Sequence, residues 1–111
     1  MQSVTTGRGA DQVMFDRAEL ESILRVYGFM VASGEWRDYA IDGLRDRAEF
    51  SVFRHSSEMP IYRVVKTPAD ARRQGAYKVV AATGAILKRG QDLKQVLKVF
   101  DRQLLRLAGG H

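Results

Sequence analysis

The hydrophobic pattern changes its period twice along the chain, and this change restricts the fold more than any other feature of the sequence. Near the N-terminus, apolar residues recur at the three- and four-residue spacing of an α-helix. In the middle they alternate with polar residues, as in strands with one buried face, and near the C-terminus helical spacing returns. A chain of 111 residues suffices for one domain but not for two with separate cores. The sequence therefore predicts a single α+β domain.

The first helix is predicted over residues 17–33. Asp16 is a suitable N-cap, and Glu19 three positions later completes a capping-box pattern. Gly34 ends the helix, because glycine readily adopts the left-handed backbone conformation that commonly follows a helix. Phe29 projects away from the apolar stripe, so its ring is expected on the surface. The stripe itself is expected to contain Leu20, Ile23, Leu24, Tyr27, Met30 and Val31.

An antiparallel meander of four or five strands is predicted between the helices. Asp42-Gly43 is a hairpin-type turn signal after the first strand, and Thr83-Gly84 is a turn signal before the last. Residues 67–75, which contain a proline, a glycine and two adjacent arginines, are expected to form a loop. The predicted strands cover residues 36–41, 48–53, 61–66, 77–82 and 85–88.

The second helix is predicted to begin after Asp92, which is its cap, and to end at Gly109-Gly110. Its apolar stripe is expected to contain Leu93, Val96, Leu97, Phe100, Leu104 and Leu107. Because each helix has one apolar stripe, the economical arrangement lays both helices on one face of the sheet. The other face is then left to water or to a partner. The apolar residues expected there are Phe53, Val80 and either Tyr62 with Val64 or Ile61 with Val65.

The expected domain organisation is a disordered tail over residues 1–12, one α+β domain over residues 13–108 and a C-terminal tail over residues 109–111. The N-terminal stretch lacks the apolar segment of a secretory signal. No apolar run approaches the roughly 20 residues that span a bilayer. The absence of cysteine suits a reducing compartment. We therefore expect a cytoplasmic protein with no membrane role.

The residue types that carry most enzymatic chemistry are few or poorly placed in this chain. The two histidines are His55, beside a predicted turn, and His111, the last residue, whereas a zinc site needs three or four suitably spaced ligands. Between residues 37 and 49 the acidic residues are interleaved with arginines, which favours surface ion pairs over paired-carboxylate catalysis. We expect no catalytic residue, no metal, no cofactor and no small-molecule ligand, and hence a protein that is not an enzyme.

Basic charge is concentrated in the second half of the chain. Residues 1–60 hold seven Arg and ten Asp or Glu, a net charge of −3, whereas residues 61–111 hold eleven Lys or Arg and three Asp, a net charge of +8. On the second helix, cations recur every four positions and share the solvent face: Lys94, Lys98, Arg102 and Arg106. Further cations lie just before this helix and in the long loop: Lys88, Arg89, Arg72 and Arg73. Such a surface is typical of contacts to a nucleic-acid backbone.

Two segments carry a resemblance to a known family. They are MVASGEWRDYAIDGLRDRAEFSVFR, residues 30–54, and AILKRGQDLKQVLKVFDRQLLR, residues 85–106. The chain resembles the domain-of-unknown-function 2794 family of small alphaproteobacterial proteins from about Val13 to Leu107. The resemblance implies an intracellular bacterial protein and supplies no site residue. The helix–meander–helix order is also similar to that of the double-stranded-RNA-binding domain, in which lysines at the start of the last helix bind phosphates. This similarity implies that the phosphate-binding residues here are Lys88, Arg89, Lys94 and Lys98.

Two functions follow as hypotheses. In the first, a non-enzymatic binding protein contacts nucleic acid or a ribonucleoprotein through the basic helix face. Base stacking is not expected there, because no aromatic residue interleaves with the cations. The alternative is a protein-interaction module, either a homodimer or an accessory subunit of a larger assembly, with Phe29 and Phe53 as contact residues. The basic face is equally compatible with simple solvation, since Lys and Arg are favoured helix formers.

Overall fold

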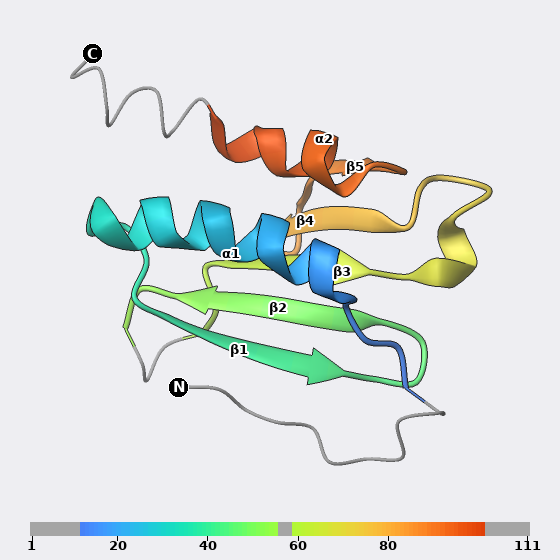
Figure 1. Ribbon diagram of the computed structural model, residues 1–111, viewed down its shortest axis with the longest axis horizontal. Coiled ribbons are helices and arrows are strands. Elements are labelled where there is room, and N and C mark those ends of the chain that lie inside the picture. Colours follow the sequence, from blue (N-terminus) through green and yellow to red (C-terminus); the bar gives the residue numbers. More distant parts are fainter. Residues whose placement is uncertain (1–11, 56–58, 102–111) are drawn as a thin grey trace.

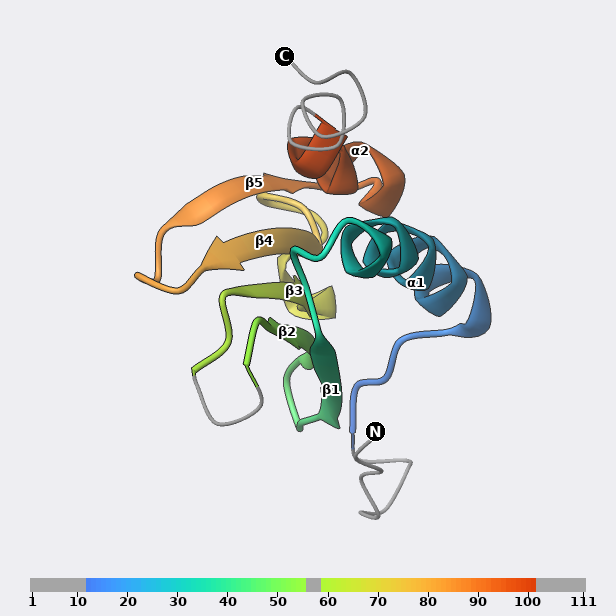
Figure 2. The same ribbon diagram turned by 90° about the vertical axis from the view of Figure 1, so that its left-hand side faces the viewer.

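Two helices lie on one face of a five-stranded antiparallel sheet in the computed structural model of the chain (Figure 1). The structure describes residues 12–55 and 59–101, so most of both predicted tails lies outside it. Each strand pairs with the next in the order β1-β2-β3-β4-β5, and Figure 2 shows both helices on the same side of this sheet. The predicted α+β fold is confirmed. In chain order the elements are α1 (Arg17–Ala32), β1 (Asp38–Gly43), β2 (Ala48–Phe53), β3 (Tyr62–Lys66), the 3-10 turn η2 (Pro68–Asp70), β4 (Tyr77–Ala81), β5 (Ile86–Gly90), α2 (Leu93–Leu97) and the 3-10 turn η3 (Lys98–Phe100).

Helix α1 begins at the predicted capping box. The Asp16 carboxylate accepts a hydrogen bond from the Glu19 N–H at 2.8 Å, and the Glu19 carboxylate accepts one from the Asp16 N–H at 2.7 Å. Gly34 follows the helix with a φ of +79°, as predicted. Leu24 and Val31 are each 38% exposed, so their predicted place in the buried stripe is wrong. The helix is rotated to bring Glu19 to hydrogen-bond partners on the sheet. Glu19, Ile23 and Met30 are buried, and Leu20, Val26 and Tyr27 pack against the core as partly buried side chains.

The hairpin between β1 and β2 turns later than predicted. The Asp42-Gly43 turn is wrong, because Gly43 stays in β1 and the turn spans residues Leu44–Arg47, closed by a 2.8 Å hydrogen bond from the first N–H to the last carbonyl. Gly43 does not have a positive φ. A Cβ at this position would lie 2.9 Å from the carbonyl oxygen of Val13 and would overlap the sulfur of Met14. Glycine is therefore required here by the close approach of the N-terminal segment.

The bounds of β5 and of the second helix also differ from the prediction. Strand β5 begins one residue later than predicted and continues to Gly90, two residues beyond its predicted end. Asp92 caps α2 as predicted, because its carboxylate accepts a hydrogen bond from the Lys94 N–H at 3.0 Å. The α-helix spans five residues, and the backbone then tightens because the Lys98 N–H bonds to the carbonyl three positions back. The rest of the predicted helix lies outside the described residues.

The core lies between the two helices and the sheet face that they cover. Trp36 packs edge-on against Phe100 with ring centroids 5.0 Å apart, and Tyr62 packs on the same ring at 5.1 Å. Trp36 precedes β1 rather than beginning it, so the predicted start of that strand is two residues too early. Burial of these apolar groups is the main favourable contribution to folding. The largest fully buried side chains are Phe50, Ile23, Met30, Val52, Val79 and Val96.

No helix of the described residues covers the opposite face of the sheet. Of the two alternatives left open for β3, Val65 lies on this face, while Tyr62 and Val64 face the core. Val65 and Val80 are only 3% and 6% exposed, since longer charged side chains surround them. Phe53 ends β2 on this face and is half-buried. The open face therefore exposes less apolar surface than the sequence suggested.

Candidate nucleic-acid interface

The structure separates the cations that the sequence predicts for nucleic-acid binding. Lys94 and Lys98 are exposed on α2 and η3. Lys88 lies opposite a core valine of β4, so it belongs to the helix-covered side of the sheet. The next residue, Arg89, points to the open side, where its guanidinium donates a hydrogen bond to the Gln74 side chain. Two of the predicted cations lie outside the described residues, Arg102 and Arg106.

The loop between β3 and β4, which contains the arginine pair, packs against the end of β5 through Gly75. Gly75 has a φ of +94° and lies so close to Gly90 that a Cβ would be 2.6 Å from the Gly90 Cα. Arg72 and Arg73 are exposed in this loop, and Arg73 lies 3.2 Å from the Asp70 carboxylate. The loop arginines therefore lie at one end of the sheet, and within the described residues no hydrogen bond or ion pair joins them to Lys94 or Lys98.

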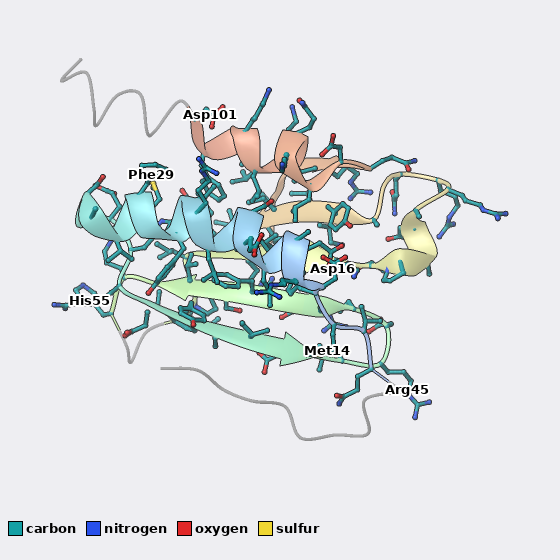
Figure 3. All side chains as sticks on the ribbon, viewed as in Figure 1. Met14, Asp16, Phe29, Arg45, His55 and Asp101 are labelled. Atoms are coloured by element: carbon teal, nitrogen blue, oxygen red, sulfur yellow. The ribbon has the colours of Figure 1, made fainter. Side chains whose placement is uncertain are left out.

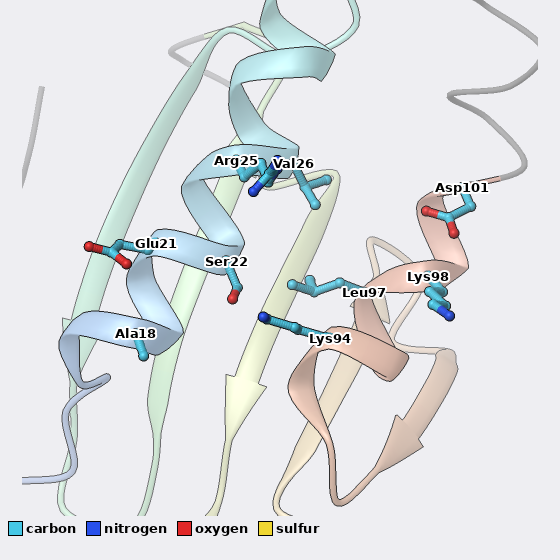
Figure 4. A pocket seen from close by; sticks show the side chains of 9 residues that line it. All are labelled: Ala18, Glu21, Ser22, Arg25, Val26, Lys94, Leu97, Lys98 and Asp101. Atoms are coloured by element: carbon cyan, nitrogen blue, oxygen red, sulfur yellow. The ribbon is translucent and has the colours of Figure 1, made fainter.

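A groove of about 430 Å³ runs between α1 and α2 (Figure 4). We call it the interhelical groove. Lys94 reaches from α2 toward α1, whereas Lys98 points away from α1. Arg25 contributes a cation from α1, and Glu21 and Asp101 are the acidic residues of the lining. The remaining lining side chains are small or apolar: Ala18, Ser22, Val26 and Leu97.

The cations around the interhelical groove outnumber its acidic residues, Glu21 and Asp101, and pair with neither of them. Within residues 12–55 and 59–101, no ion pair involves Arg25, Lys94 or Lys98. Glu21 on the same groove is already paired, because the guanidinium of Arg17 lies 3.6 Å from its carboxylate. The groove therefore presents positive charge from both of its helices.

Sequence reasoning found the lysines of this groove but missed Arg25. The four-residue step on the second helix is a local signal that points to Lys94 and Lys98. Arg25 lies in a mixed-charge face of α1 and becomes part of the site only because the two helices pack side by side. No pattern within either helix reports that contact.

The two aromatic residues predicted to contact a protein partner lie on different surfaces. Phe29 is 56% exposed on α1 (Figure 3). Phe53 is half-buried at the end of β2, on the sheet face that the helices leave open. The fold does not bring these two rings together into one contact surface.

The most buried ionisable cluster fastens the start of α1 to the sheet. Lys66 donates hydrogen bonds of 2.8 Å to the Glu19 carboxylate and to the carbonyl oxygen of Met14. The Tyr77 hydroxyl donates a short hydrogen bond to the other carboxylate oxygen of Glu19. Burial acts to raise the pKa of Glu19, but the hydrogen bonds from Lys66, Tyr77 and the Asp16 N–H outweigh it, and its pKa lies below the ordinary value. Burial and the same carboxylate raise the pKa of Tyr77.

This cluster makes stability depend on pH in the acid range. The lowered pKa of Glu19 means that its carboxylate stabilises the fold above the ordinary value of 4.5, and that this contribution is lost as the pH falls through the lowered pKa. We expect the difference in free energy of unfolding between the native chain and a Glu19→Gln variant to narrow below pH 4.5. Urea denaturation from neutral to strongly acidic pH measures it. A difference that stays constant with pH would contradict this assignment.

His55 and the acidic side chains of the described residues do not form a metal site. His55 is exposed beyond the end of β2, and its sequence neighbours 56–58 lie outside the described part of the chain. No group of three or more His, Cys, Asp or Glu side chains within the described ranges is placed to hold a metal ion. In the same ranges, none of the helices has the length and apolar character needed to cross a membrane.

Comparison with known proteins identifies one family. A family model described as a protein of unknown function, DUF2794, matches residues 13–97. No curated protein and no solved structure shows significant similarity to the chain. The matched range contains α1, all five strands and α2, and it includes both helices of the interhelical groove.

Proposed function

The chain belongs to the DUF2794 family of proteins of unknown function, and we propose from its surface that it binds nucleic acid through the interhelical groove. In this proposal it acts in the cytoplasm, either on free nucleic acid or within a ribonucleoprotein, and it catalyses no reaction. The observation that carries the proposal is a set of cations from both helices of the groove that form no ion pair within the described residues: Arg25, Lys94 and Lys98. Like charges gathered on one surface repel one another, and a polyanion relieves that repulsion.

The groove favours contact with phosphates rather than with bases. Its lining contains no aromatic residue among the described side chains, so it offers no ring on which a base would stack. Lys94 projects across the space between the helices, and the Ser22 side chain lies on the facing side (Figure 4). An ammonium and a hydroxyl are both good donors to phosphate oxygens. We therefore expect little dependence on base sequence.

Salt dependence is the measurable consequence of this mode of binding. Three phosphate contacts predict a slope of about −2.7 in a plot of log binding constant against log salt concentration for duplex DNA. Each of the substitutions Arg25→Ala, Lys94→Ala and Lys98→Ala should reduce the slope by about 0.9. Fluorescence anisotropy with labelled duplex and single-stranded RNA and DNA across a salt series measures both quantities.

Arg45→Ala is the matched control for these variants. Arg45 is an exposed cation in the turn between β1 and β2, at the far side of the sheet from α2 (Figure 3). Its replacement lowers the net charge by the same amount but should leave the slope unchanged. The proposal fails if binding is absent at low salt, if it is insensitive to salt, or if the control weakens it as much as Lys94→Ala.

A protein-interaction role is the second candidate, and the exposed apolar side chains of α1 favour it. Phe29 is 56% exposed, and Leu24 and Val31 are each 38% exposed on the same helix. Exposed aromatic rings are common anchors of protein interfaces. The binding assay separates the two candidates, because a protein that binds no nucleic acid at low salt retains only this second role.

A further inference from the structure

A row of five side chains crosses the open face of the sheet, one from each strand. The strand register places each member directly opposite the next. The preceding or following residue on each of the inner strands, such as Phe50, Val64 and Val79, belongs to the core, so the row lies on the face opposite α1 and α2. In strand order the row consists of Asp42, Glu49, Val65, Lys78 and Arg89.

The charges of this row are sorted by sign. Asp42 and Glu49 make the β1 side acidic, and Lys78 and Arg89 make the β5 side basic. Both pairs put like charges directly across neighbouring strands, an arrangement that destabilises a sheet. The Arg47 guanidinium, 2.7 Å away, balances Glu49, whereas Asp42 and Lys78 make no ion pair within the described ranges. The described residues of a single chain therefore leave part of this charge uncompensated.

We propose that the open face binds a second copy of this chain, face to face, about a two-fold axis parallel to the strands. That rotation reverses the strand order over the facing sheet, so each acidic side of the row meets a basic side. Asp42 then faces the partner's Arg89, and Glu49 faces the partner's Lys78. A two-fold axis perpendicular to the strands would instead place each charge over its own kind. The order of signs selects the first arrangement, and each of these two charge contacts occurs twice.

The rest of the face leaves room for such a contact, although the same axis places Arg63 on β3 opposite the partner's Arg63. Packed sheets lie about 10 Å apart, a gap that long charged side chains from both copies span. The face has a depression of about 300 Å³, lined in part by Glu49 and Lys78, which leaves room for side chains of the second copy. Ile86, 43% exposed at the rim, adds apolar area, while Val65 and Val80 are already covered. Association is therefore driven mainly by charge and weakens with salt.

Sedimentation velocity on the full chain, at a series of protein concentrations and salt concentrations, tests this proposal. We expect a monomer–dimer equilibrium at low salt that shifts toward monomer at high salt. The double variants Lys78→Glu/Arg89→Glu and Asp42→Lys/Glu49→Lys make the row uniformly acidic and uniformly basic. Each should raise the dissociation constant at least about tenfold. An equimolar mixture of the two variants should form a heterodimer, because the acidic row of one then faces the basic row of the other.

Lys88→Glu is the matched control. Lys88 neighbours Arg89 on β5 but lies on the other side of the sheet, so this charge reversal should leave the dissociation constant unchanged. Because Glu49→Lys also removes the bond to Arg47, Asp42→Lys alone serves as a second basic variant. The proposal is overturned if the native chain is monomeric at every concentration at low salt, if Lys88→Glu weakens the dimer as much as Lys78→Glu/Arg89→Glu, or if the mixed variants remain monomeric. None of these outcomes depends on nucleic-acid binding.

Discussion

A Glu19→Gln variant is expected to lose about 3 kcal/mol of its free energy of unfolding at neutral pH, which is what breaking a buried ion pair typically costs. Glutamine keeps the shape of the side chain but removes the charge that Lys66 faces at 2.8 Å. The Lys66 side chain is only 18% exposed, so water replaces the carboxylate poorly. The Tyr77 hydroxyl also loses a charged acceptor. Because Glu19 joins α1 to β3 and β4, the loss should affect the whole domain.

Glu21→Gln on the same helix provides the control. The Glu21 carboxylate is 70% exposed and lies 3.6 Å from Arg17, so its removal should change the free energy of unfolding by less than about 0.5 kcal/mol. Combining Glu19→Gln with Lys66→Met should recover part of the loss, since no unpaired charge then remains buried. Urea denaturation followed by Trp36 fluorescence measures all three. Equal losses in the two glutamate variants would show that the cluster does not fasten α1.

Replacing Gly75 with alanine should cost about 3 kcal/mol or more. Its φ of +94° strains any side chain, which contributes about 1–3 kcal/mol. A Cβ would also lie 2.6 Å from the Cα of Gly90 and closer still to its carbonyl group, so the loop and β5 would have to separate. Backbone atoms cannot rotate out of the way as a long side chain does, and such overpacking adds about 1–3 kcal/mol.

Gly84→Ala distinguishes the two contributions. Gly84 has the same φ of +94°, but no atom lies within 4 Å of the position that its Cβ would occupy. Its replacement should therefore show the backbone strain alone, about 1–3 kcal/mol. Thermal or urea unfolding of both variants gives the difference directly. If the two substitutions cost the same, the contact between Gly75 and Gly90 contributes nothing to stability.

Elements defined by local signals were predictable from the sequence. The capping box joins Asp16 and Glu19 within one helical turn. In β2, apolar residues at every second position identify the buried face of the strand. The rotation of α1 was not predictable in this way. It depends on a hydrogen bond between Glu19 and Lys66, which are 47 positions apart in the chain. Because Glu19 is charged, a pattern of apolar residues could not place it on the buried side.

The misplaced hairpin has a similar cause. Asp-Gly is a common turn sequence, but Gly43 lies in a strand. Its lack of a side chain allows the N-terminal segment to pass close to the backbone there. The same limit applies to the candidate sites. The spacing of Lys94 and Lys98 was visible within one helix, whereas Arg25 joins them only through helix packing. The sorted row on the open face likewise becomes visible only once the register of all five strands is known.

The two edges of the sheet have a consequence for how large an assembly of this protein can grow. At the β1 edge, the N-terminal segment crosses Gly43, and the Val13 N–H bonds to the Leu44 carbonyl at 2.8 Å. At the β5 edge, Leu87 is an extra residue that interrupts the regular register, and Lys88 stands beside it. Bulges, charges and covering segments all discourage strand-by-strand addition of further chains. Growth of fibrils by edge pairing is therefore disfavoured, and a contact through the sheet face closes after two chains.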